Sequence, residues 1–150
     1  MNEPSLAPTK RERRWDRTTA RFVRIVGFVD CLALVAVLMP RDVMASISGH
    51  LGFAPFSSGP LPEYLARSTS LLYALHGALL LYVANDVARY RGLIRWLGLL
   101  AMAHGGIMLL IDIRIGMPAW WCVLEGPTFA LVGLVLWLLA KRGSTVDAEN

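Results

Sequence analysis

Charged residues are scarce over most of this 150-residue chain. Four apolar stretches, at residues 22–39, 68–88, 93–113 and 119–140, hold only six charged side chains. These six are Arg24, Asp30, Asp86, Arg95, Asp112 and Glu125. A soluble globule alternates polar and apolar positions instead of segregating them along the chain. The segregation excludes a cytosolic enzyme domain, a disordered chain and a DNA-binding module, and it predicts an integral membrane protein.

Cysteines and reaction motifs are also scarce. The two cysteines, Cys31 and Cys122, are expected at different depths, too far apart for a disulfide. The sequence has no HExxH, CxxC or HxxxH spacing, no nucleotide-binding loop and no serine elbow. The motifs therefore predict no metal site, and the sequence leaves any cofactor unknown.

Each apolar stretch can cross a bilayer as a helix, which needs about 20 apolar residues. The stretches are too long and too continuously apolar for barrel strands. We expect an all-α fold, an integral membrane four-helix bundle with antiparallel up-down topology. Its spans are predicted at about 22–39, 62–90, 93–113 and 119–140. Residues 21–142 would form the membrane domain, residues 1–20 a basic disordered cytoplasmic arm, and residues 143–150 a polar tail.

The basic residues predict the orientation. Twelve lysines and arginines lie near one set of span ends, and three, Arg41, Arg67 and Arg114, lie near the other. Cytoplasmic ends carry the excess of basic residues, so both termini are expected in the cytoplasm and the protein in the inner (plasma) membrane. A cleaved signal peptide is the competing interpretation of the first span. Asp30 and the long basic region before the span argue against it.

Four ionisable residues are predicted to form a polar pocket on the outward side: His76, His104, Asp112 and Glu125. Counting from the span ends places His76 and His104 at matching depth on adjacent helices. Ionisable groups at membrane depth need a partner or a function. The sequence leaves open whether these four share a pocket, bind a metal or only hydrogen-bond between helices.

Two local features concern helix geometry. Pro127, after Glu125 and Gly126, predicts a kink in the last helix rather than its start, because a start there would leave the helix too short. Small residues at helical spacing mark expected contact faces between helices. They are Ser70, Ala74 and Ala78, then Ala101 and Gly105, then Gly126, Ala130 and Gly133.

A second polar cluster lies toward the cytoplasm and is expected to form structural ion pairs. Asp86 and Arg89 are three residues apart and can pair on one helix. Asp30 is expected to find Arg24, Arg95 or a hydroxyl group.

A resemblance to a known group of proteins rests on three features of the sequence. They are the four spans joined by short loops, the arginine-rich segment before the first span, and the Gly-Met-Pro turn after Asp112. The chain resembles small uncharacterised bacterial four-helix inner-membrane proteins, of the DoxX-like group in general type. The resemblance covers the topology of residues 22–140 and implies no catalytic residue and no activity.

Without a recognisable catalytic motif, we expect an accessory subunit or a binder of an apolar small molecule, a lipid or quinone, in the outward-side pocket. The alternative is a membrane-embedded isomerase or redox enzyme acting on a lipid-soluble substrate, with Glu125 or His76 as acid/base. The expected partners are the bilayer, such a ligand, and either a second copy of the chain or other subunits of a membrane complex. Nucleic acid is not expected, because the basic arm lacks interleaved aromatic residues.

Overall fold

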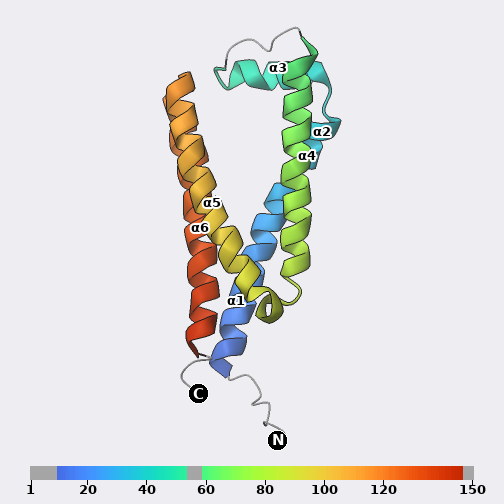
Figure 1. Ribbon diagram of the computed structural model, residues 1–150. Coiled ribbons are helices and arrows are strands. Elements are labelled where there is room, and N and C mark those ends of the chain that lie inside the picture. The colour runs from blue at the N-terminus through green and yellow to red at the C-terminus, as the bar shows by residue number, and fades with distance from the viewer. Residues whose placement is uncertain (1–9, 54–58, 147–150) are drawn as a thin grey trace, which may run out of the picture.

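The computed structural model describes residues 10–53 and 59–146, and these residues form helices and connections with no strand among them. The helices are α1 (Lys10–Cys31), α2 (Leu34–Leu38), α3 (Arg41–His50), α4 (Pro60–Val83), α5 (Val87–Ile115) and α6 (Ala119–Val146). The four long helices run roughly along one direction, with the start of α1 and the end of α6 at the same end of the molecule (Figure 1). The all-helical prediction is confirmed for this part of the chain.

Local sequence signals set the ends of α4 and α5. Prolines occupy the first turn of α4, where the missing backbone donor costs nothing. The Asp86 carboxylate caps α5 by accepting a bond from the backbone N–H of Arg89 at 3.1 Å. Gly116 ends α5 in the left-handed conformation with φ of 74°, which glycine adopts at little cost. The backbone N–H of Met117 then donates to the Asp112 carbonyl at 2.9 Å and closes the helix end.

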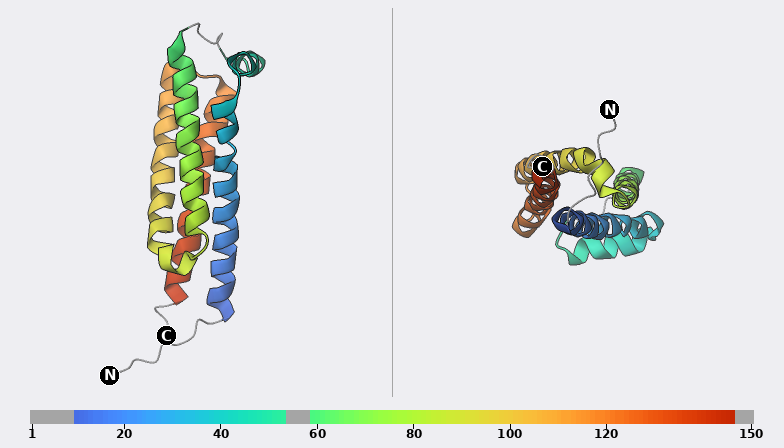
Figure 2. Two further views of the ribbon diagram at one scale, coloured as in Figure 1. Left: turned by 90° about the vertical axis from the view of Figure 1, so that its right-hand side faces the viewer. Right: turned by 90° about the horizontal axis from the view of Figure 1, so that it is seen from below.

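The helices form two closely packed pairs, α1 with α4 and α5 with α6 (Figures 1 and 2). The pairs meet around the connection between α4 and α5 and diverge toward the other end, where α4 and α5 stand apart (Figure 1). The buried apolar core lies at the closed end. Its members are Val23, Leu80, Val83, Ala84, Val87, Ile94, Leu136 and Ala140.

Facing glycines allow the helices of each pair to approach closely. A Cβ atom added to Gly98 would lie 2.7 Å from the Gly133 carbonyl oxygen, and one on Gly126 would lie 2.6 Å from the Gly105 carbonyl oxygen. Such separations exclude any side chain, so each glycine is required by its neighbour's backbone. The expected contact face of Ala101, Gly105, Gly126, Ala130 and Gly133 is thus found between α5 and α6.

A similar crossing joins α1 to α4. A Cβ atom on Gly77 would meet the Gly27 carbonyl oxygen at 2.5 Å and the backbone nitrogen of Cys31 at 2.7 Å. Of the small residues expected on this helix, Ala74 is buried, and the Cys31 thiol donates to its carbonyl at 3.7 Å. The α1–α4 contact therefore also depends on small side chains.

The α2–α3 segment crosses the open end of the molecule. The chain bends by 119° between Lys10–Leu38 and Arg41–His50, and α3 lies across the gap between α4 and α6 (Figure 1). Arg67 of α4 satisfies carbonyl oxygens left free where α2 ends, donating to Val37 and, at 2.9 Å, to Met39. Beyond α3, the Phe53 ring packs on Trp121 with ring centroids 5.0 Å apart. These contacts hold α3 to both helix pairs.

Two helices in the described ranges, 10–53 and 59–146, are long and apolar enough to cross a membrane: α5 over Val87–Ile115 and α6 over Ala119–Arg142. The number of candidate spans in these ranges rises to three if the two helical segments Lys10–Leu38 and Arg41–His50, which are bent relative to each other, form one span. Large apolar side chains cover the outer surface of α5 and α6, as with Leu110 and Val123. In a membrane, such a surface contacts lipid.

The structure corrects the predicted ends of the chain and of the first span. Residues 1–9 lie outside the described residues, but residues 10–20, predicted to be part of a disordered arm, form the first turns of α1. They fold because they pack on the bundle: Thr19 is 2% exposed, and Asp16 pairs with Arg91 of α5 at 2.9 Å. The predicted span 22–39 is interrupted by a turn between α1 and α2. The helix α6 continues to Val146, into the predicted tail.

Candidate functional site: a cleft between α4 and α5

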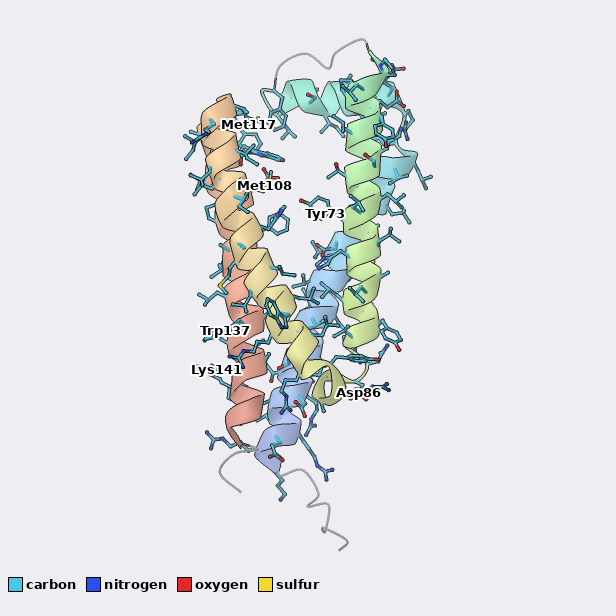
Figure 3. All side chains as sticks on the ribbon, viewed as in Figure 1. Tyr73, Asp86, Met108, Met117, Trp137 and Lys141 are labelled. Atoms are coloured by element: carbon cyan, nitrogen blue, oxygen red, sulfur yellow. The ribbon has the colours of Figure 1, made fainter. Side chains whose placement is uncertain are left out.

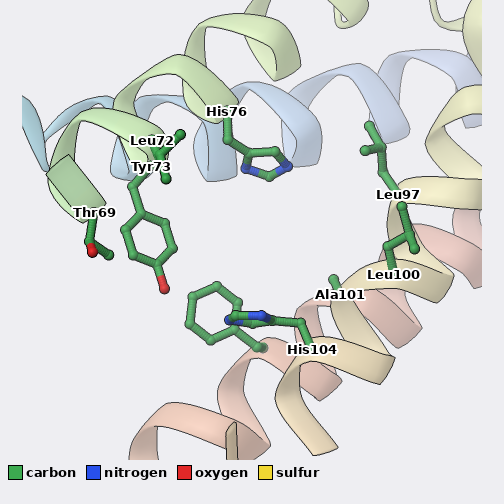
Figure 4. Close-up of a pocket in the computed structure, with 9 residues that line it drawn as sticks. Thr69, Leu72, Tyr73, His76, Leu97, Leu100, Ala101 and His104 are labelled. Carbon is green, nitrogen blue, oxygen red and sulfur yellow. The ribbon is translucent and has the colours of Figure 1, made fainter. Parts of the chain in front are cut away.

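An apolar cleft of about 390 Å³ lies where α4 and α5 separate. Figure 4 shows its wall, with Tyr73 and His76 on α4 facing His104 on α5. The cleft is lined by Thr69, Leu72, Tyr73, His76, Leu97, Leu100, Ala101, His104 and Phe129. Most of these side chains are apolar, while two imidazoles, one phenol and one hydroxyl can form directed hydrogen bonds. This composition is typical of small-molecule sites.

Helical spacing explains why these residues share the wall. On α4, Thr69, Tyr73 and His76 follow i, i+4 and i+7, which places them on one face of the helix. The α5 residues Leu97, Leu100, Ala101 and His104 repeat the same spacing. Each helix therefore turns one stripe toward the cleft.

His76 is held by Asp30 of α1. Its Nδ1 atom lies 2.8 Å from Asp30 Oδ2, and the Asp30 side chain is 15% exposed. With the proton on Nδ1, the imidazole donates a hydrogen bond to the Asp30 carboxylate, and Nε2 is left available to a ligand. The expected partners of Asp30, Arg24, Arg95 or a hydroxyl, are wrong: the partner is His76. The cause is the Gly27–Gly77 contact, which brings the backbones of α1 and α4 together beside Asp30.

Phe129 of α6 connects the aromatic groups of the cleft. Its ring stacks on Tyr73 with centroids 5.8 Å apart and an interplanar angle of 22°. The His104 ring meets it edge-on at 4.9 Å. Figure 3 shows Tyr73 reaching from α4 toward the α5–α6 pair. These aromatic contacts bridge the two helix pairs across the cleft.

Two of the four residues predicted to share a pocket line the cleft, and the other two lie near it. His76 and His104 line the cleft, whereas Asp112 and Glu125 are not among its lining residues. Glu125 accepts a bond from the Trp121 indole and has Asp112 and His104 as electrostatic neighbours. Asp112 is 2% exposed, and its Oδ2 atom has no hydrogen-bond partner in the described part of the chain. The acids thus stand beside the cleft, on the side of α5 that faces α6.

Pro127 lies inside α6 and does not begin it, in agreement with the interpretation of residues 119–140 as one helix. The preceding residue, Gly126, packs against Gly105 of α5. In this structure Gly126 therefore serves the close contact between α5 and α6.

The polar residues that were expected to form structural ion pairs have different partners from those predicted. Asp86 precedes α5 and bonds the backbone of Arg89, while the Arg89 guanidinium lies over the Tyr90 ring, 5.5 Å from its centroid. Asp86 is therefore a helix cap. Sequence reasoning missed the Asp16–Arg91 ion pair, whose partners are 75 residues apart.

Sequence reasoning also missed Thr69, Tyr73 and Phe129. For Thr69 and Tyr73, a signal was present in their helical spacing from His76. Nothing in the sequence placed Phe129 against Tyr73 of a different helix pair. In the described ranges, no three His, Cys, Asp or Glu side chains converge as metal ligands.

Comparisons of the chain with protein-family models, curated proteins and solved structures give no match. The DoxX-like resemblance therefore stays a prediction.

The Asp30–His76 contact is expected to stabilise the fold measurably. A hydrogen bond to a charged group contributes about 1.5–3 kcal/mol, and exposure lowers this, since 43% of the His76 side chain is exposed. We expect Asp30→Asn and His76→Gln to be coupled by about 1 kcal/mol in a double-mutant cycle. Unfolding of the detergent-solubilised variants measures the coupling. Asp42→Asn, on the exposed side of α3, is the control and should show no coupling to His76→Gln. Fully additive effects of the first two substitutions would show that the contact does not stabilise the fold.

Proposed function

We propose that this chain is a four-helix integral membrane protein that binds an apolar small molecule, a lipid or a quinone, in the cleft between α4 and α5. The observation that carries the proposal is the cleft itself: an apolar cavity with His76, His104 and Tyr73 directed into it. Apolar walls with a few fixed polar groups suit a largely hydrophobic ligand with a polar head group.

Four spans are proposed although, among the described helices, only α5 and α6 are by themselves long and apolar enough to cross a membrane. The polar side chains that lower the hydropathy of α4 have partners within the protein. His76 bonds Asp30, and Arg67 bonds Glu63 at 2.9 Å as well as the end of α2. Polar groups satisfied in this way are tolerated at membrane depth. The up-down order of the helices then places both termini on one side.

Both termini are proposed to be cytoplasmic, because the basic ends of α1, α5 and α6 lie together at the closed end of the molecule. There, Lys141 lies over the Trp137 ring at 5.0 Å (Figure 3). Fusions test this orientation. Green fluorescent protein after residue 150 or after Asn85 should fluoresce, and alkaline phosphatase after Gly116 should be active. Phosphatase activity from a fusion after Asn85 would contradict the orientation.

Binding is tested by extracting the protein purified in mild detergent and identifying the bound molecules by mass spectrometry. The proposal predicts about one molecule of a lipid or quinone per chain, retained through washing with detergent. A protein that retains nothing, and binds neither added quinone nor added phospholipid, would contradict the proposal.

A second candidate function is an acid/base enzyme acting on a lipid-soluble substrate. The Asp30–His76 pair favours it, because a carboxylate at Nδ1 orients the imidazole and makes Nε2 a better base. Glu125, the other acid/base residue of the prediction, does not line the cleft. His76→Gln separates the two functions. For a binder, the extract should contain the same ligand as the wild type, whereas for an enzyme it should contain an accumulated, chemically different substrate.

A further inference from the structure

A second cavity, of about 440 Å³, lies at the closed end of the molecule, between α1 and the connection from α4 to α5. Three arginines of α1 line it, Arg17, Arg21 and Arg24. They follow i, i+4 and i+7 and therefore share one face of the helix. The opposite wall is the segment 84–88.

The two carboxylates that line this cavity, Asp16 of α1 and Asp86, already have partners within the protein. Asp16 forms its ion pair with Arg91 at 2.9 Å, and Asp86 caps α5. Arg24 reaches across the cavity, with Nη2 3.4 Å from the Ala84 carbonyl oxygen. The cavity therefore presents more positive than negative groups, and guanidinium groups bind phosphate oxygens in a planar, bidentate geometry.

The face of α1 that carries the arginines continues into an apolar stripe. Phe28 of α1, and Leu32 directly after the end of α1, extend the spacing of the three arginines, and they are 62% and 52% exposed. The backbone N–H of Leu32 still bonds the Phe28 carbonyl at 3.2 Å. A ligand that places an anionic group at the arginines would thus find an exposed apolar surface directly beyond it. Free phosphate has no apolar part that could contact this stripe, whereas the acyl chains of a phospholipid can pack along it.

We propose that the cavity between α1 and the α4–α5 connection binds the phosphate head group of an anionic phospholipid, whose acyl chains lie along Phe28 and Leu32. The proposal rests on the membrane placement given above, but not on the α4–α5 cleft or its ligand. Basic pockets between helices at the cytoplasmic face of a membrane suit such head groups.

The test is native mass spectrometry of the full-length protein in mild detergent, titrated with dioleoyl phosphatidylglycerol or with dioleoyl phosphatidylcholine. The wild type should retain one phosphatidylglycerol in preference to phosphatidylcholine. Arg21→Gln with Arg24→Gln should lower that retention roughly 10- to 30-fold, because each basic residue near the surface contributes to binding. The pair Arg21→Lys and Arg24→Lys keeps the charge and should keep most of the retention.

The matched control is Arg11→Gln with Arg14→Gln. It removes the same charge from exposed positions of the same helix, outside the cavity. Equal losses in both glutamine pairs, or no loss in either, would overturn the proposal. Millimolar inorganic phosphate should not displace the lipid, and full displacement would overturn the assignment to a lipid. If the cavity variant loses helix content by circular dichroism, Arg21→Gln alone replaces it, because this side chain is exposed.

A ligand retained in the α4–α5 cleft should be unaffected by these substitutions. Loss of phosphatidylglycerol with the cleft ligand kept supports a separate lipid site. An empty cleft with phosphatidylglycerol still bound would instead contradict only the function proposed for the cleft.

Discussion

Replacing Gly105 by alanine is expected to destabilise the protein by about 1–3 kcal/mol, although alanine is the better helix former. The added Cβ atom would lie 2.6 Å from the backbone nitrogen of Ala130 and would also meet the Gly126 carbonyl oxygen. Both obstacles are backbone atoms, so the helices must move apart. The α5–α6 contact is the most extensive helix contact of the structure, so the loss should be global.

The neighbouring glycine supplies the control for this prediction. A Cβ atom on Gly106 meets nothing within 4 Å, so Gly106→Ala should be neutral or stabilise the helix by up to about 1 kcal/mol. Thermal unfolding in detergent compares the two, and each kcal/mol corresponds to a shift of roughly 2–4 °C. Equal melting temperatures for Gly105→Ala and Gly106→Ala would show that α5 and α6 do not pack as described.

The second large effect is expected when the cleft is filled. Leu72 of α4 and Leu100 of α5 line it from opposite sides. The two side chains are 67% and 57% exposed, so a larger side chain can be accommodated at either position. Two tryptophans at these positions would occupy the space of the ligand. We expect Leu72→Trp with Leu100→Trp to weaken ligand retention at least about tenfold, or 1.4 kcal/mol.

Leu71→Trp with Leu110→Trp is the matched control. Both control positions are exposed leucines on the same two helices, 43% and 64% exposed, and neither lines the cleft. The control pair should retain the ligand as the wild type does. Equal retention by the two tryptophan pairs would place the ligand elsewhere on the protein.

Much of the helical framework could be predicted from the sequence. The apolar runs of α5 and α6 were evident from composition, and the predicted start of the second span near residue 62 agrees with a helix α4 that begins at Pro60. The small residues of α5 and α6 predicted a close contact, and the structure pairs Gly98 with Gly133 and Gly105 with Gly126. Such signals could be found because they are local or repeat at helical spacing.

The pairing of polar groups could not be predicted in the same way. Counting residues along a span gives the depth of a side chain but not the direction in which it points, and each residue turns the helix by about 100°. His76 and His104 therefore reach one cleft, whereas Asp112 is buried on another side of α5. The Asp30–His76 contact joins residues 46 positions apart and depends on the crossing of α1 and α4.

Sequence reasoning missed the first turns of α1 because they, like the polar pairs, depend on residues far along the chain. Their sequence is basic and lacks an apolar stripe, which is typical of a disordered arm. Their order depends on partners far along the chain, such as Arg91 for Asp16 and Arg142 for the Trp15 ring, 5.3 Å from its centroid.

Photolabelling tests the central claim, a ligand held in the α4–α5 cleft, most directly. The purified protein would be irradiated with a photoreactive analogue of the lipid or quinone identified in the extract, and the labelled residues mapped by mass spectrometry. The account predicts label concentrated on Leu72, Leu97 and Leu100, and its loss when the unlabelled ligand is in excess. Label spread evenly between these residues and the outward-facing Leu110, with no competition, would contradict the account.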